Sequence, residues 1–582
     1  MAPVQSSIGL MALRLLAARG WGFLEKLPLV SRLANFMQVV YAKLPFWGNS
    51  RERHGGECRL PAAENGLIEH PTPLTLEAGE NNSGEENGAD IDALSSPGGD
   101  EDSPEQEGLD GDFQCDPSHE ALRQEDYWMQ ELPYYQWYVG DEDDEYNDFY
   151  CFREILKALD FDRLSQQVLV TRQRSDPEYA GGAPTVTDQT CGSFNICFEL
   201  TFDDGVRWML RVPCTGTKEK WAAISARALE NEARTMMLLK KWSTIPLPEV
   251  FAFSATPDNE LGFPYIIMPF VDGKSAYEVW FGHDYGLHSA AENEKCRRRI
   301  LEGVASSMKQ LGRFTFYKGG FLKFCEDGTV SGVGPMRMMN YKAMNDGSMD
   351  DAYFETGPFL YPEDQYLAAL EMLGEADSSV DLLKELLRCV PENAEEKDEF
   401  DLAHPDLDLQ NIIVSDDGTV QAIIDWDGVA AVPMSIGSRK YPLWLTQDWQ
   451  FYARGWEGPP SEFTPAHKAW KHRDDMIKGY RQMYQQLLDE AHPELEIPAL
   501  GRDAAKDFTR WSLVAGTVYH AAMIPIERKH TVMGLMDKLA EVAAEGVEVD
   551  YYKFLFAIED GELDDEMLDN LEEAFASLLK AV

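Results

Sequence analysis

Positive charge is scarce in this chain of 582 residues, which has 52 Lys and Arg side chains against 101 Asp and Glu side chains and a formal net charge of −49. A surface that binds DNA or RNA needs surplus Lys and Arg to neutralise phosphates, so this balance argues against a nucleic-acid partner. It is compatible with a positively charged small molecule. An acidic surface also keeps a protein soluble, and the composition leaves both interpretations open.

Cysteine is sparse as well. The nine cysteines are scattered singly, without a C-x-x-C pair and without the His and Cys spacing of a zinc site. A disulfide scaffold and a structural zinc ion are therefore not expected, and the pattern indicates reduced thiols in an intracellular compartment. The first expectation for localisation is the cytoplasm.

Long uninterrupted apolar runs are missing too. Basic residues break both apolar stretches near the start of the chain, at residues 8–24 and 27–47, so no transmembrane segment is predicted. Residues 1–50 are basic, poor in acid and helix-prone, as in a mitochondrial transit peptide or a helix on a membrane surface. A helix packed on the domain or a plain basic tail fits equally well. A mitochondrial location is thus the alternative, and peripheral membrane contact of this segment stays open.

Apolar side chains are few in residues 51–125, which are rich in Asp and Glu and, beyond residue 53, contain only Arg59 and Arg123 as basic residues. Such a segment cannot bury enough surface to offset the entropy lost on ordering, so a disordered acidic linker is predicted. Residues 126–180 form an aromatic and helical lead-in. An acidic arm that folds back over a pocket of the domain is the sharper alternative to a solvated linker.

One stretch does carry a specific chemical pattern. From His404 to Asp427 the chain reads HPDLDLQNIIVSDDGTVQAIIDWD, which is H-x-D-x-x-x-x-N, a predicted hairpin, and then I-I-D-W-D. Phosphoryl transfer needs an aligned hydroxyl, a divalent metal and neutralised phosphate oxygens. Asp406 can accept the proton of the hydroxyl, while Asn411 and Asp425 offer hard oxygen ligands to Mg²⁺. A surface hairpin with these residues in turns and caps is the plain alternative.

This stretch resembles the aminoglycoside phosphotransferase / choline kinase-like family, especially its fungal branch. The resemblance rests on the catalytic loop, the I-I-D-W-D motif, the following Val432-Pro433 and the run WLTQDW that begins at Trp444. It implies an α+β, bilobal protein-kinase-like fold. A small β-rich N-lobe would span residues 181–272, a larger and mostly helical C-lobe residues 273–582, and ATP would bind between them.

The upstream sequence fits this expectation. Two alternating strands are predicted between residues 189 and 213, and a G-S-x-N turn, Gly192 to Asn195 with Ser193, precedes the first. Backbone N–H groups of such a turn can approach phosphate oxygens, although an ordinary turn at the start of a strand looks the same.

The resemblance also implies a phosphate-binding pair and an adenine site. Arg211 occupies the place of the lysine that holds the α and β phosphates, and Glu232, on a helix predicted over residues 221–242, occupies the place of its partner. Arg keeps the charge but is longer and planar. The backbone near Met268 would meet the adenine edge, with Ile413 as an apolar floor.

The implied reaction is ATP- and Mg²⁺-dependent transfer of the γ-phosphate to a hydroxyl of a small molecule, with Asp406 as the base. Helices predicted at residues 466–491, 504–523, 532–544 and 565–580 would build the acceptor pocket. An ammonium-bearing acceptor could lie among aromatic and acidic side chains, although tryptophans at such junctions are more often core. The positions concerned are Trp426, Asp427, Trp444, Asp448 and Trp449.

Two alternatives accompany this prediction. Arg211 and the loop with a single glycine favour a pseudokinase-like nucleotide-binding or scaffold protein without turnover, whereas the retained Asp406, Asn411 and Asp425 oppose it. A protein kinase acting on Ser or Thr is disfavoured, because no A-P-E-like segment follows Asp425.

Overall fold

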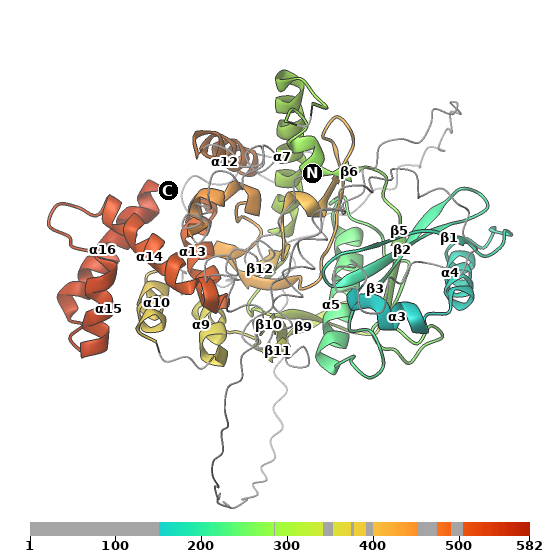
Figure 1. The fold of residues 1–582 in the computed structure, drawn as a ribbon, viewed down its shortest axis with the longest axis horizontal. Helices are drawn as coiled ribbons and strands as arrows, with labels where there is room; N and C mark the ends of the chain where they lie inside the picture. Colours follow the sequence, from blue (N-terminus) through green and yellow to red (C-terminus); the bar gives the residue numbers. More distant parts are fainter. Residues whose placement is uncertain are drawn as a thin grey trace, which may run out of the picture. The chain divides into compact units, whose positions relative to one another are not determined.

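The computed structural model describes residues 150–284, 286–340, 353–373, 377–390, 400–451, 474–490 and 505–582 (Figure 1). The predictions for residues 1–50 and 51–125, and for the lead-in before residue 150, lie outside these ranges. None of the helices within them is long and apolar enough to span a membrane.

An antiparallel five-stranded sheet forms the N-terminal lobe, in the order β1-β2-β3-β5-β4. Its strands are β1 (Thr185–Cys191), β2 (Asn195–Thr201), β3 (Arg207–Pro213), β4 (Ala252–Ser254) and β5 (Tyr265–Pro269). In β3 buried residues alternate with partly exposed ones, so Trp208, Leu210 and Val212 enter the core while Arg211 points to the other face. Strands β2 and β3 are the two strands predicted between residues 189 and 213, whereas β1 and β4 were not predicted.

Helices cover this sheet. The lead-in comprises the short η2 (Tyr150–Phe152), α3 (Arg153–Ala158) and α4 (Phe161–Ser175), whose Gln167 donates a hydrogen bond of 3.0 Å to the Tyr265 hydroxyl of β5. Helix α5 (Ala223–Trp242) follows β3 and buries Leu229, Met236 and Leu239. Its apolar stripe explains why the predicted helix forms here.

Short strands hold the central part of the C-terminal lobe. Strand β12 (Phe400–Ala403) pairs with β15 (Ala430–Pro433) and β7 (Thr315–Phe316), and β13 (Ile412–Val414) pairs with β14 (Val420–Ile423) and β6 (Lys274–Ser275). Before β6, Gly273 has a φ of +150°, and a Cβ atom there would lie 2.7 Å from the Val414 carbonyl oxygen. The connection between the lobes therefore needs glycine at this point.

Two further hairpins, which the sequence does not predict, lie between α7 (Ala290–Leu311) and α9 (Pro362–Leu373). One joins β8 (Phe321–Phe324) to β9 (Val330–Gly334), and the other pairs β10 (Met336–Met339) with β11 (Tyr353–Thr356). We call these four strands the inserted hairpins. Strands β8, β10 and β11 contact α5.

The remainder of the C-terminal lobe is helical, drawn from yellow to red in Figure 1. Besides α6 (Ala276–Trp280), it contains α10 (Ser378–Arg388), α12 (Asp474–Asp489), α13 (Ala505–Met523), α14 (Pro525–Val542), α15 (Tyr551–Asp560) and α16 (Asp565–Ala581). The predicted helical regions are found, but α14 starts at Pro525 because proline suits a first turn. Helix α15 is missed. The predicted α+β fold, with a β-rich N-lobe and a helical C-lobe, is confirmed.

Candidate active site

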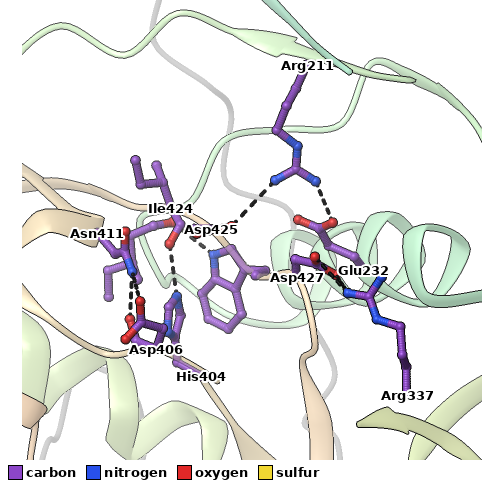
Figure 2. Close-up of polar contacts among 11 residues, drawn as sticks. Arg211, Glu232, Arg337, His404, Asp406, Asn411, Ile424, Asp425 and Asp427 are labelled. Carbon is purple, nitrogen blue, oxygen red and sulfur yellow. Dashed lines mark hydrogen bonds and ion pairs between the residues drawn. The ribbon is translucent and has the colours of Figure 1, made fainter. Parts of the chain in front are cut away.

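The loop that carries Asp406 and Asn411 is fixed at both ends by strands. It leaves β12 after Ala403 and enters β13 through a short 3₁₀ turn, η3 (Leu409–Asn411), which the Asp408 carboxylate caps by accepting from Leu409 N at 2.8 Å. The Asn411 amide nitrogen donates to the Asp406 carbonyl oxygen at 2.8 Å and to Asp406 Oδ2 at 3.0 Å (Figure 2). Asp406 and Asn411 therefore lie together, as predicted.

His404 ties this loop to the segment before Asp425. Its side chain is buried, and Nε2 lies 3.0 Å from the Ile424 carbonyl oxygen, which can only accept, so Nε2 carries the proton. Burial lowers the pKa of His404 to about 3, which keeps the ring neutral at physiological pH. The His404 ring packs edge-on with the buried Trp426 indole, with 4.7 Å between the ring centroids. His404 and Trp426 thus support the site structurally.

Asp425 has an unusual backbone conformation. Its φ is +63°, and it is the only residue other than glycine with a positive φ in the described ranges. Aspartate tolerates this region better than most residues, and such conformations concentrate at functional sites. The side chain is 46 % exposed, and the β13–β14 hairpin brings it near Asn411 because Ile424 N donates to the Asn411 carbonyl at 2.9 Å.

Negative charge is crowded around Asp425. Although its side chain is 46 % exposed, desolvation by the surrounding protein raises the pKa of the Asp425 carboxyl; Arg211 opposes this shift, while Glu232, Asp427 and Asp406 reinforce it. A cation at this position would relieve the repulsion. No cluster of three or more His, Cys, Asp or Glu side chains in the described ranges could hold a metal alone. One carboxylate and one amide oxygen nevertheless suit Mg²⁺, which commonly keeps waters and phosphate oxygens as its other ligands.

The Arg211–Glu232 ion pair predicted from the sequence is present. Arg211 Nη2 on β3 bonds to Glu232 Oε2 on α5, and Arg211 Nη1 lies 3.8 Å from Asp425 Oδ1 (Figure 2). The side chains of Arg211 and Glu232 are 11 % and 2 % exposed. Burial disfavours the Arg211 cation, but the surrounding carboxylates, Glu232 foremost, raise its pKa above the ordinary value. Arginine here is a permanent cation.

The remaining predicted positions lie on both lobes. Gly192 and Ser193 form the turn between β1 and β2, and the Gly192 N–H bonds to the Asn195 carbonyl at 2.9 Å, so this donor is already used within the hairpin. Asn195 lines a cavity of about 30 Å³ together with Arg211 and Glu232. Met268 lies on β5 opposite Met209, and Ile413 is the only partly exposed residue of β13.

Two cations at the site were missed by sequence reasoning. Lys440 Nζ donates to the His404 carbonyl at 3.0 Å, and burial lowers its pKa to about 8 although Asp406 opposes the shift. Arg337 of β10 donates to both carboxylate oxygens of Asp427, at 2.7 and 2.8 Å, and stacks on the Tyr353 ring at 4.3 Å. No motif marks either residue, because each reaches the site through a tertiary contact.

The side chains considered for binding an ammonium group are engaged in ion pairs or buried in the core. Asp427 is paired with Arg337, and Asp448 is paired with Arg481 at 2.7 Å between Nη2 and Oδ2. The three tryptophans are core residues with exposed fractions of at most 8 %. They are Trp426, Trp444 and Trp449. The three tryptophans therefore match the core assignment that the sequence favoured over an ammonium cage.

Comparison with known proteins bears on the chemistry. Residues 198–435 match the family model described as the phosphotransferase enzyme family. The mitochondrial protein "Altered inheritance of mitochondria protein 9" of Candida albicans is 26 % identical over 136 residues, which is 23 % of this chain and 21 % of that protein. A subtelomeric hrmA-associated cluster protein of Aspergillus fumigatus is 32 % identical over 97 residues, 17 % of this chain and 18 % of that protein. The match thus spans about a fifth of these relatives.

Among solved structures, the amicoumacin kinase hAmiN, in complex with AMP-PNP, Ca²⁺ and Ami, is similar at 11 % identity and a TM-score of 0.34. The similarity covers 70 % of this chain and 96 % of that one. The family match contains both halves of the site, from the Arg211–Glu232 pair to the segment of residues 404–427. Residues 198–435 of this chain are thus similar in sequence to the phosphotransferase enzyme family.

Proposed function

We propose that this protein is an ATP- and Mg²⁺-dependent phosphotransferase that moves the γ-phosphate of ATP to a hydroxyl group of a small molecule. The observation that carries the proposal is the convergence of Asp406, Asn411, Asp425 and the Arg211–Glu232 pair at one place from separate segments of the chain (Figure 2). The match of residues 198–435 to the phosphotransferase family model supports the reaction class.

Asp406 is the proposed base. Both side-chain donors to its carboxylate, from Gln410 at 3.3 Å and Asn411 at 3.0 Å, bond to Oδ2. Oδ1 is therefore the atom available to accept the proton of the incoming hydroxyl. Burial raises the pKa of Asp406, and the Asn411 hydrogen bond and Lys440 limit the shift, so the carboxylate becomes a better acceptor.

Asn411 and Asp425 are the proposed metal ligands. Because the Asn411 nitrogen is committed to Asp406, its Oδ1 atom is left to bind the cation. When bound, Mg²⁺ would neutralise the negative charge on the phosphate oxygens and help to orient the γ-phosphate toward the attacking hydroxyl. The exposed Asp425 carboxylate beside Arg211 supports this assignment.

The nucleotide would bind along the N-terminal sheet. Arg211 would bind its phosphates while Glu232 fixes the guanidinium, and the turn from Gly192 to Asn195 would lie over them. The backbone near Met268 would meet the edge of the adenine, and Ile413 would form an apolar floor below it. The alternative, a nucleotide-binding scaffold without turnover, is favoured by the engaged Gly192 N–H and by arginine in place of lysine.

The acceptor is proposed only as a small hydroxyl compound. The proposal that the acceptor is positively charged is supported only by the acidic composition of the chain. The two carboxylates considered for binding it, Asp427 and Asp448, are paired with arginines. For localisation we favour the mitochondrial alternative over the cytoplasm, because the Candida relative is named as mitochondrial. The cytoplasmic expectation gains no support.

A thermal-shift titration with ATP tests the proposal first. Stabilisation that grows with nucleotide and requires Mg²⁺ is expected, because a ligand that binds only the folded state raises its stability. Incubation with a metabolite extract and ATP should then yield a product heavier by one phosphoryl group in mass spectrometry. Mg²⁺-dependent stabilisation without any such product would favour the scaffold alternative, and no stabilisation at millimolar ATP would reject a nucleotide site.

A further inference from the structure

The buried side-chain amide of Asn231 forms hydrogen bonds to the backbone of two other segments of the chain. It precedes Glu232 on α5 and is 3 % exposed. Its Nδ2 atom donates to the Val429 carbonyl oxygen at 2.7 Å, and its Oδ1 atom accepts from Leu322 N at 2.9 Å. A buried amide of this kind fixes the backbone it contacts, because losing either bond leaves a polar group without a partner.

The segments that Asn231 joins all belong to the active site or its support. Val429 closes the turn that begins at Trp426, directly after Asp425, since Val429 N donates to the Trp426 carbonyl at 2.9 Å. Leu322 belongs to β8 of the inserted hairpins. Asn231 itself stands beside Glu232, the partner of Arg211.

Helix α5 has a second attachment to the inserted hairpins. One turn before Asn231, Arg227 forms two bonds of 2.6 Å with the carboxylate of Glu355 on β11. The neighbouring β10 supplies Arg337 to Asp427, which is two residues beyond Asp425. The inserted hairpins therefore contact both α5 and the segment of residues 425–429.

We propose that Asn231 is a positioning residue that fixes α5 against residues 425–429, so that the Arg211–Glu232 pair stays in register with Asp425. The effect on nucleotide binding rests on the function proposed above. The geometric part, that Asn231 holds α5 and residues 425–429 together, does not depend on it. Asn231 acts through Glu232 and the Val429 carbonyl and does not itself touch phosphates.

The chain offers a matched control. Asn293 on α7 is 1 % exposed, donates to the Trp280 carbonyl at 2.8 Å and accepts from His283 N at 2.9 Å. Asn231→Asp and Asn293→Asp each keep the acceptor and replace the donor with a carboxylate oxygen facing a carbonyl. Both substitutions should lower Tm, but only the first should disturb the nucleotide site.

The test combines calorimetric binding of Mg–AMP-PNP with hydrogen exchange of the full chain. We expect Asn231→Asp to weaken binding about tenfold, the effect of one lost hydrogen bond, and to speed exchange in residues 223–242 and 425–431. Asn293→Asp should change neither quantity there. In a Glu232→Gln background the affinity effect of Asn231→Asp should shrink, because the two act through one contact network.

Unchanged binding and exchange in folded Asn231→Asp, or equal weakening by Asn293→Asp, would overturn the proposal. If the wild type binds no nucleotide, the proposed function fails, and hydrogen exchange alone decides the inference. Faster exchange confined to the two stretches supports it, and no change rejects it. If Asn231→Asp does not fold, Asn231→Ala removes both bonds without adding charge and is measured in the same way.

Discussion

The Nη1 atom of Arg211 lies 3.8 Å from Oδ1 of Asp425, although Arg211 belongs to β3 of the N-terminal sheet and Asp425 follows β14 of the C-terminal lobe. Because Arg211 also pairs with Glu232, one guanidinium joins the phosphate-handling and metal-binding halves of the proposed site. Four predictions follow from this arrangement and from the loop beside it.

Replacing the proposed base should abolish most turnover without unfolding the protein. Asp406→Asn keeps the size of the side chain but cannot take up a proton, and we expect phosphoryl transfer to fall by about 10²- to 10⁴-fold. The rate of ADP formation with the acceptor found in the metabolite screen measures this. Asp416→Asn, at a position 80 % exposed on the hairpin, is the control and should retain activity. A wild-type rate for Asp406→Asn would refute the base assignment.

Removing one charge at the proposed metal site should remove the response to Mg²⁺. Asp425→Asn is chosen because Asn also tolerates the φ of +63° found here. The rise in Tm that ATP produces with Mg²⁺ should drop to the level seen with EDTA, since the amide is a poorer ligand than the carboxylate. If the Mg²⁺-dependent part of the shift stays the same, Asp425 does not bind the metal.

Breaking the buried ion pair from one side should destabilise the fold. In Arg211→Met the Glu232 carboxylate, 2 % exposed, loses its cation, and we expect a loss of about 3–5 kcal/mol in the free energy of unfolding measured with urea. The double variant Arg211→Met/Glu232→Met should recover much of it, because the buried Glu232 carboxylate is no longer left without its cation. Arg211→Lys should lose less than Arg211→Met. Equal losses in single and double variants would contradict the pairing.

His404 should make stability sensitive to acid. The folded His404 has a pKa of about 3 against 6.5 for an ordinary histidine, so below pH 6.5 the unfolded chain takes up a proton that the folded chain does not. The contribution of the neutral, buried His404 to the free energy of unfolding is complete above pH 6.5 and is lost progressively as the pH falls toward 3.

His404→Gln keeps a donor for the Ile424 carbonyl but cannot titrate. Between about pH 6 and about pH 4, the free energy of unfolding of the wild type should decrease by about 1.4 kcal/mol more per pH unit than that of His404→Gln. Denaturant titrations at several pH values provide the comparison. Parallel slopes would show that His404 is protonated in the folded state.

Local sequence explains much of the fold that was predicted. The hairpin of β13 and β14, the strand β3 that carries Arg211, and helix α5 all follow from short-range alternation or a helical apolar stripe. The inserted hairpins were missed because β8 to β11 are only four or five residues long, and their pairing depends on neighbours.

By itself, the sequence determined the family resemblance and the residues proposed for phosphoryl transfer, because a loop between two strands keeps Asp406 and Asn411 within hydrogen-bond reach at fixed spacing. Only the tertiary structure decided which charges are available. Asp427 forms an ion pair with Arg337, and Asp448 forms one with Arg481. No local sequence pattern predicts that either arginine lies beside its carboxylate. Each of these ion pairs joins segments that are distant in sequence. It therefore forms only when tertiary packing brings the two segments together.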